Sequence, residues 1–229
     1  MSTQRFRVWF RKGARVRYIS HLDVLRYWER AIRRAGLPLS YSQGFTPHPK
    51  LAFAGPLPLG FTADCEVMDV TLDERVSASE FRDRLARETT PDLALVDVAE
   101  VAPASPPPQA LVTWADYRVE LPGVDAATAA TVVGEFLAKT DVPWSEERKE
   151  KVRTYNLRAA VASLRAEPAE GGTRLQMRLQ ADQELMARPE QVVAALFPGT
   201  EPAEICRAGL VLNESSPARD AWRRQGRFQ

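Results

Sequence analysis

Four arginines at helical spacing offer the clearest chemistry in this sequence. On a helix that turns about 100° per residue they fall within one arc of about 80°. They are Arg26, Arg30, Arg33 and Arg34. The apolar Leu25, Trp28 and Ile32 occupy a separate arc, which predicts a helix with one buried face and one basic face. Because arginine binds phosphates through paired donors and stacks on bases, the basic face favours contact with RNA or DNA. The alternative is a solvated face that Asp23 and Glu29 partly neutralise.

A short segment after this helix gathers further groups that suit nucleic acid. Residues 40–50 combine hydroxyls, an amide, aromatic rings and a cation around Gly44, in Ser40, Tyr41, Ser42, Gln43, Phe45, His48 and Lys50. The many turn formers predict a structured loop. We interpret it as a cradle for a base or a phosphate, in which Tyr41, Gln43, Phe45 and Lys50 extend the basic face. The alternative is that Tyr41 and Phe45 fill the core and the prolines only stiffen the connection.

The two histidines of the chain, His21 and His48, both lie in this basic part. Metal-free ribonucleases can use such a pair as base and acid for attack by a 2′-hydroxyl, with arginines stabilising the transition state. They are therefore the candidate catalytic residues. The alternative is a packing role for His21, which lies nearer the apolar arc of the helix. Neither has a cysteine or a third histidine close in the sequence, so we predict no metal site.

Periodicity and turn residues predict the elements that position these groups. Residues 5–11 favour a strand, and a second extended stretch is predicted at 15–19. Ser20 and Asp23 have capping-box spacing ahead of a helix that ends near residue 35. The order β-α-β-β-α-β is then completed by strands at 51–54 and 65–72, a helix at 77–89 and a strand at 93–101.

A proline-rich segment at 103–110 is predicted to be a semi-rigid linker. Beyond it the same order recurs more faintly, in a strand at 113–121, a helix at 125–139, extended stretches near 153–164 and 173–179, a helix at 189–197 and a strand near 205–212. We therefore predict an α+β protein of two tandem ferredoxin-like (split βαββαβ) domains, at residues 1–102 and 111–213. Residues 214–229 are predicted to be a polar tail.

Composition narrows the class of protein. Residues 1–50 carry eleven Lys or Arg side chains against two acids, whereas residues 51–110 carry four Arg against eleven acids. Such sorting predicts one positive surface that collects phosphates. No apolar run is long enough for a membrane helix, and no signal peptide is evident, so we expect a cytoplasmic protein. Cys65 and Cys206 are predicted to be free thiols, and no motif predicts a cofactor.

Several motifs together resemble those of a known family. They are Tyr18-Ile-Ser-His-Leu-Asp23, Arg33-Arg-Ala-Gly-Leu-Pro38, Tyr41-Ser-Gln-Gly-Phe-Thr-Pro-His-Pro-Lys50 and Pro56-Leu-Pro-Leu-Gly60. The chain resembles the radical SAM-linked proteins, an uncharacterised bacterial family found alone or fused to radical SAM proteins. The resemblance implies a context of RNA or ribosome metabolism and supplies no activity. Asn156 stands where such proteins tend to have an aspartate, so that charge is absent here.

The leading hypothesis is an RNA-binding accessory module that works with a separate radical SAM enzyme, with tRNA or ribosomal RNA as candidate partners. One alternative is a metal-free endoribonuclease of the CRISPR repeat-processing type that uses His21 and His48. That comparison is one of architecture alone. The other alternative is a protein-docking adaptor whose basic face binds an acidic partner, such as the radical SAM enzyme itself.

Overall fold

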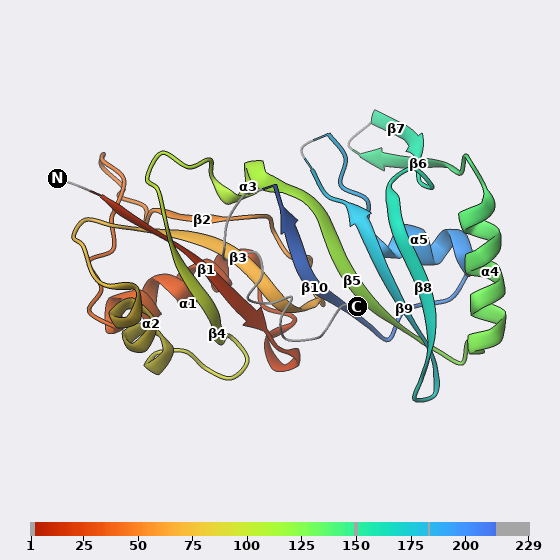
Figure 1. Cartoon of the computed structure of the whole chain (residues 1–229), viewed down its shortest axis with the longest axis horizontal. Helices are drawn as coiled ribbons and strands as arrows, with labels where there is room; N and C mark the ends of the chain where they lie inside the picture. Colours follow the sequence, from red (N-terminus) through yellow and green to blue (C-terminus); the bar gives the residue numbers. More distant parts are fainter. Residues whose placement is uncertain (1–2, 149–150, 183, 214–229) are drawn as a thin grey trace.

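Strands from both halves of the sequence combine into one mixed sheet (Figure 1). The structure, a computed structural model, describes residues 3–148, 151–182 and 184–213. The predicted tail at 214–229 lies outside the described residues. Helices pack against the sheet in both halves, so the predicted α+β class is confirmed. None of the described helices is long and apolar enough to cross a membrane.

The first half of the chain follows the predicted order of elements. It comprises β1 (Gln4–Lys12), α1 (His21–Arg34), β2 (Leu51–Phe53), β3 (Thr62–Leu72), α2 (Ala78–Arg87) and β4 (Leu95–Val101). The extended stretch predicted at 15–19 is wrong, because a 3-10 turn forms at Ala14–Val16. The ammonium group of Lys12 donates to the carbonyls of Arg17, at 3.0 Å, and Ile19, at 3.4 Å, which holds the chain in a turn.

The second half adds more strands than the sequence predicts. It comprises α3 (Pro108–Leu111), β5 (Val112–Pro122), α4 (Ala126–Ala138), β6 (Pro143–Arg148), β7 (Lys151–Asn156), β8 (Val161–Ala169), β9 (Gly172–Gln180), α5 (Pro189–Leu196) and β10 (Glu204–Leu212). The extended stretch predicted near 153–164 forms the end of β7 and the start of β8, with a turn between them. It is divided at Asn156, whose side chain accepts from the Val142 amide and donates to the Thr140 carbonyl. β6 and β7 form a separate two-stranded hairpin.

The last strand joins the two halves. The strand order is β4-β1-β3-β10-β5-β9-β8, and β2 pairs with β3 outside this path. One edge of β10 pairs in parallel with β3, through Cys206 opposite Thr62 and Arg207 opposite Ala63, and the other edge pairs antiparallel with β5. Because a strand from the end of the chain hydrogen-bonds to the first half, the halves share one sheet. Two tandem ferredoxin-like domains are therefore not confirmed.

Two apolar clusters pack the helices on the sheet, and the second also includes Trp9 of β1 and Val67 of β3. In the first half, Phe6 and Phe10 of β1 pack with Trp28 of α1 and Phe81 of α2. In the second half, Val119 of β5 belongs to a cluster with side chains of α4 and α5. Alternation along a strand then directs every second side chain of β1 and β5 to the sheet face opposite these contacts.

The helix with the predicted basic face forms as the sequence indicates. Ser20 caps α1: its hydroxyl accepts from the Asp23 amide, and the Asp23 carboxylate accepts from the Ser20 amide, a reciprocal capping box. The buried side chains Val24, Trp28, Ala31 and Ile32 recur every three or four residues. Gly36, at φ +63°, ends the helix in the left-handed region. The cap and the buried stripe fix the direction in which the arginines point.

Candidate nucleic-acid interface and central pocket

Three of the four predicted arginines form an open basic face on α1. Arg26, Arg30 and Arg33 are exposed. The guanidinium of Arg26 lies 3.7 Å from the Asp23 carboxylate, with about 63% and 54% of the two side chains exposed, so this pair is weak. Among the described residues, the side chains of Arg30 and Arg33 make no hydrogen bond or ion pair. These two cations are therefore free to bind a ligand.

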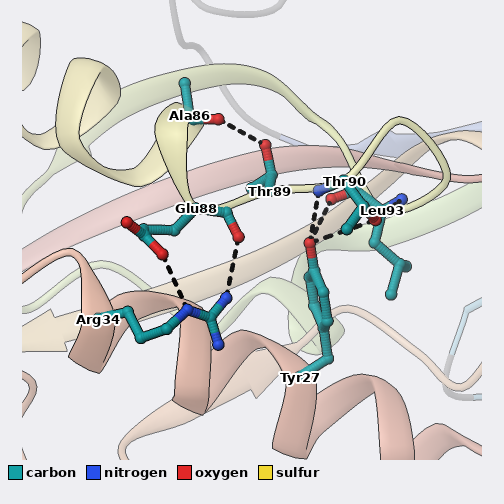
Figure 2. A network of polar contacts seen from close by, with 7 residues as sticks. All are labelled: Tyr27, Arg34, Ala86, Glu88, Thr89, Thr90 and Leu93. Atoms are coloured by element: carbon teal, nitrogen blue, oxygen red, sulfur yellow. Dashed lines mark hydrogen bonds and ion pairs between the residues drawn. The ribbon is translucent and has the colours of Figure 1, made fainter.

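Arg34 has a different role, which Figure 2 shows. Its guanidinium donates to the Glu88 carboxylate at 2.8 Å and to the Glu88 carbonyl at 3.1 Å, at the end of α2. Two helical turns earlier on α1, the Tyr27 hydroxyl accepts from the Thr90 amide at 2.8 Å and donates to the Leu93 carbonyl at 3.2 Å. Arg34 and Tyr27 thus tie α1 to the segment that follows α2. Arg34 keeps its charge near the basic face but already has a partner.

The predicted loop lies between α1 and β2, and its base pairs with the end of β3. Its base is held by backbone hydrogen bonds of Ser40 and Lys50 to Thr71 and to each other. Its neck is held between Ser42 and His48, where the Ser42 amide donates to the His48 carbonyl at 2.8 Å and the His48 amide donates to the Ser42 hydroxyl at 2.9 Å. The loop is therefore ordered by its own turn chemistry.

The loop side chains divide between support and exposure. The Tyr41 hydroxyl donates to the Glu29 carboxylate of α1 at 3.0 Å, and burial, together with this hydrogen bond, raises the pKa of Tyr41. Phe45, at the tip, is fully exposed, and Gln43 and Lys50 are exposed as well. Tyr41 therefore fixes the loop against α1 and packs against the core of the first half, as the alternative prediction has it for this residue, while Phe45 does not fill the core. An exposed aromatic ring suits a nucleic-acid base.

The structure does not bring the two histidines together. The His21 ring packs edge-on against Phe53, with 4.9 Å between ring centroids, and burial lowers the pKa of His21. His48 lies exposed in the loop, which contacts α1 at Glu29 through Tyr41. His21 and Glu29 are separated by about 12 Å along α1 at a rise of 1.5 Å per residue. No contact between described residues joins the two histidines.

Other basic residues of the first fifty serve the fold. Arg7 is fully buried and donates from Nε to Asp69 at 2.7 Å. Lys12 is buried, and loss of solvation lowers its pKa, partly offset by the nearby Glu66 carboxylate. The charge count of the segment therefore overstates its accessible positive charge. Periodicity in the sequence distinguishes exposed from buried basic side chains on α1. It does not do so on the first strand, because that strand alternates imperfectly.

A polar cavity of about 230 Å³ lies where the two halves meet, and the sequence does not predict it. This central pocket is lined mainly by charged side chains from four strands and the end of β1, namely Arg11, Asp64, Arg118, Glu120, Arg174 and Glu204. Arg118 precedes Val119 on β5, so its side chain points away from the face that α4 and α5 cover. No local motif predicts the pocket, because its residues come from segments far apart in the sequence.

The two cysteines are free, as the sequence predicts, and both are buried. Burial raises the pKa of Cys65 to about 12, and burial also raises the pKa of Cys206, which lines the central pocket. Both are therefore neutral thiols near neutral pH, a poor state for a nucleophile. Within the described ranges, no group of three or more His, Cys, Asp and Glu side chains is placed to hold a metal ion.

Comparison with known proteins places the chain among bacterial proteins. A family model described as "Uncharacterized protein conserved in bacteria (DUF2344)" matches residues 5–189. The chain belongs to this family. The match covers α1, the loop and most of the central pocket, but ends before Glu204 and Cys206. No curated protein matches the chain.

Two solved structures are similar to parts of the chain. A chain in "Crystal Structure of a Cbf5-Nop10-Gar1 Complex" matches with a TM-score of 0.48 and 14% identity, over 89% of this chain and 48% of that one. This chain thus spans about half the length of that protein. An unknown protein from Galdieria sulphuraria matches with a TM-score of 0.28 and 16% identity, over 85% of this chain and 90% of that one.

Proposed function

We propose that the protein is an RNA-binding accessory module whose contact surface is the exposed face of α1 together with loop 42–48. The observation that carries this proposal is the pair Arg30 and Arg33, exposed on a capped helix and without a hydrogen bond or ion pair to another described residue. Unpaired arginines at a surface bind phosphates without first breaking an internal ion pair. The two arginines are not needed for the packing of α1, so ligand binding is a role that explains them.

The surroundings of these arginines support the same proposal. α1 is held by its capping box, by the buried Trp28 and by the contacts of Arg34, so the basic face is rigid before a ligand arrives. Loop 42–48 adds the exposed ring of Phe45, on which a base can stack, and Lys50 adds a further cation. Fixed cations combined with an exposed stacking ring favour an unpaired RNA strand or loop over a regular duplex.

The experiment is RNA binding as a function of salt. The probe is a fluorescent single-stranded oligoribonucleotide, titrated with the purified full chain between about 50 and 200 mM salt. For Arg30→Gln with Arg33→Gln we expect weaker binding and a salt slope that falls by about one unit for each lost phosphate contact. The matched control is Arg75→Gln with Arg82→Gln, which removes the same charge from exposed arginines that pair with Glu100 and Asp97.

The control separates the surface from net charge. If both double variants weaken binding equally, the interaction reports overall charge and the α1 surface is not the site. If wild-type affinity does not change with salt, phosphates are not the main contacts and the proposal fails. Phe45→Ala then tests stacking, for which about 1–3 kcal/mol per base is expected.

The partner in this proposal is the radical SAM enzyme that the sequence resemblance implies, and the implied setting is tRNA or ribosomal RNA. The docking alternative uses the same arginines, so it predicts a complex with that enzyme that survives ribonuclease and is lost on Arg30→Glu with Arg33→Glu. The endoribonuclease alternative receives no support from the placement of His21 and His48 at separate parts of the first half.

A further inference from the structure

The central pocket has the composition of a small-ligand site. At about 230 Å³ it is smaller than the roughly 300–1,000 Å³ of pockets for drug-sized molecules. None of the described residues that line it is aromatic, and its charged side chains carry both signs. A ligand that fits must therefore be small and hydrophilic, and must offer both an anionic group and hydrogen-bond donors.

The arginines of the pocket retain unused donors. Toward the described residues, Arg118 donates from Nη2 alone, to Asp64 at 2.6 Å and to the Cys206 sulfur at 3.4 Å. Arg174 donates to them from Nε alone, to Glu120 at 2.5 Å. Arg11 is exposed and makes no ion pair with another described residue. Since a guanidinium has five donors, each arginine keeps N–H groups for an anion, and phosphate is the anion whose geometry matches them.

The carboxylates are likewise half used. Within the described part of the chain, one oxygen each of Asp64, Glu120 and Glu204 accepts a side-chain hydrogen bond, from Arg118, Arg174 and the Thr62 hydroxyl respectively. The second oxygen of each carboxylate can accept from a ligand. A bare phosphate would leave these carboxylates facing an anion without a donor between them. Neighbouring hydroxyls on the ligand supply that donor, as when a carboxylate binds a ribose hydroxyl.

We infer that the central pocket binds a ribose phosphate unit, with the phosphate on the arginines and the hydroxyls on the carboxylates. The unit comes either from a free sugar phosphate or from the phosphorylated end of an RNA strand. The inference goes beyond RNA binding by α1 and does not depend on it, because none of the described residues that line the pocket belongs to α1 or to loop 42–48. Gly13 lines the pocket, and the turn after it leads to the start of α1. The phosphorylated end of an RNA strand bound near α1 is therefore a source of the ligand that the fold allows.

The chain offers a matched pair of variants to test this inference. Arg174 and Arg178 both lie on β9 and both pair with an acid of β5, Arg174 with Glu120 and Arg178 with Asp116. Arg174 lines the pocket, and Arg178 is not among its lining residues. Asp116 is buried whereas Glu120 is about 30% exposed, so Arg178→Gln costs at least as much stability as Arg174→Gln. A specific loss of binding in Arg174→Gln therefore cannot be a folding effect.

The measurement is calorimetric titration of the full chain with ribose 5-phosphate, inorganic phosphate and ribose. We expect ribose 5-phosphate to bind about tenfold or more tightly than either fragment, Arg174→Gln to weaken it by about tenfold or more, and Arg178→Gln to leave it within about twofold. Glu120→Gln keeps the side-chain volume but removes the charge that accepts from the sugar hydroxyls. The ratio of the affinities for ribose 5-phosphate and for phosphate should therefore fall. No binding at millimolar ligand, equal binding of phosphate, or an equal loss in both arginine variants overturns the inference.

A competition experiment then assigns the source of the ligand. If an oligoribonucleotide with a 5′-phosphate displaces ribose 5-phosphate and its 5′-hydroxyl counterpart does not, the pocket takes strand ends. If neither competes, it takes the free sugar phosphate. Failure of the α1 proposal is measured independently, with the Arg30 and Arg33 variants and the salt slope.

Discussion

The arginines inside the sheet and the arginines on α1 have the same chemistry and different fates. Arg207 of β10 is buried and donates from Nε to the Glu66 carboxylate at 2.7 Å, across the junction of the two halves. Arg30 and Arg33 of α1 are exposed and free of partners among the described residues. The comparison teaches that the surroundings of an arginine, and not its presence in a basic segment, decide whether it stabilises the fold or is available to a ligand.

The largest expected effect is on stability, in the buried region. Arg207→Gln leaves Glu66 buried and unpaired and also removes contacts of the guanidinium with the carbonyls of Gly55 and Pro56. An uncompensated buried charge costs about 3–5 kcal/mol, and we expect the free energy of unfolding to fall by that amount. Urea unfolding followed by tryptophan fluorescence measures it.

Two companions sharpen this result. Arg75→Gln breaks an exposed pair with Glu100 and is expected to change the free energy of unfolding by less than about 1 kcal/mol. The double change Arg207→Met with Glu66→Leu removes both charges and should recover much of the loss. A similar loss in Arg75→Gln would show that burial does not distinguish the two kinds of pair.

An intermediate effect is expected where the loop meets the helix. Tyr41→Phe removes the hydrogen bond to Glu29 and keeps the ring, so we expect a loss of about 1 kcal/mol in the free energy of unfolding. If loop 42–48 is part of the RNA surface, this variant also weakens RNA binding, because the loop loses its attachment to α1. Unchanged RNA affinity with reduced stability would remove the loop from the proposed surface.

The buried region also predicts a pH dependence. The pKa of His21 is lowered from its ordinary value of 6.5, chiefly by burial; Arg207 and Lys12 lower it further, and Glu66 opposes them. Below about pH 6.5 the unfolded chain therefore binds a proton at His21 more readily than the folded chain does, so stability falls as the pH falls.

Urea unfolding at several pH values between about 5 and 8 measures this effect of His21. In His21→Gln the decline toward acidic pH should be smaller than in the wild type. The exposed His48 provides the control, since His48→Gln should keep the wild-type profile. A wild-type profile in His21→Gln as well would contradict the assignment of this pH dependence to His21.

Local signals in the sequence predict the elements that they control. The Ser20–Asp23 capping box and the apolar spacing of Leu25, Trp28 and Ile32 predict α1 almost to the residue, although the buried side chains are Val24, Trp28, Ala31 and Ile32. The basic face follows from the same periodicity. The α+β class follows from the order of elements. By contrast, the pairing of β10 with β3 depends on contacts between segments more than one hundred residues apart, for which no local pattern exists.

The same limit applies to the candidate site: its local features can be predicted from the sequence, and its long-range contacts cannot. The sequence identifies Arg30 and Arg33 correctly as members of an exposed face, but it groups Arg34 with them, because helical spacing cannot show that Glu88 lies opposite. The central pocket is invisible in the sequence, since Asp64, Arg118 and Arg174 are adjacent only after the strands pair.

The smallest expected effects compare two arginines of α1 itself. Arg34→Gln breaks the exposed contacts with Glu88, so we expect a loss of up to about 1 kcal/mol in the free energy of unfolding and little change in the salt slope of RNA binding. Arg30→Gln should leave stability unchanged and lower the salt slope by about one unit. Unfolding and RNA titration of the two single variants measure both quantities. Equal slopes would mean that Arg34 exchanges Glu88 for phosphate on binding, and the basic face would then include all four arginines.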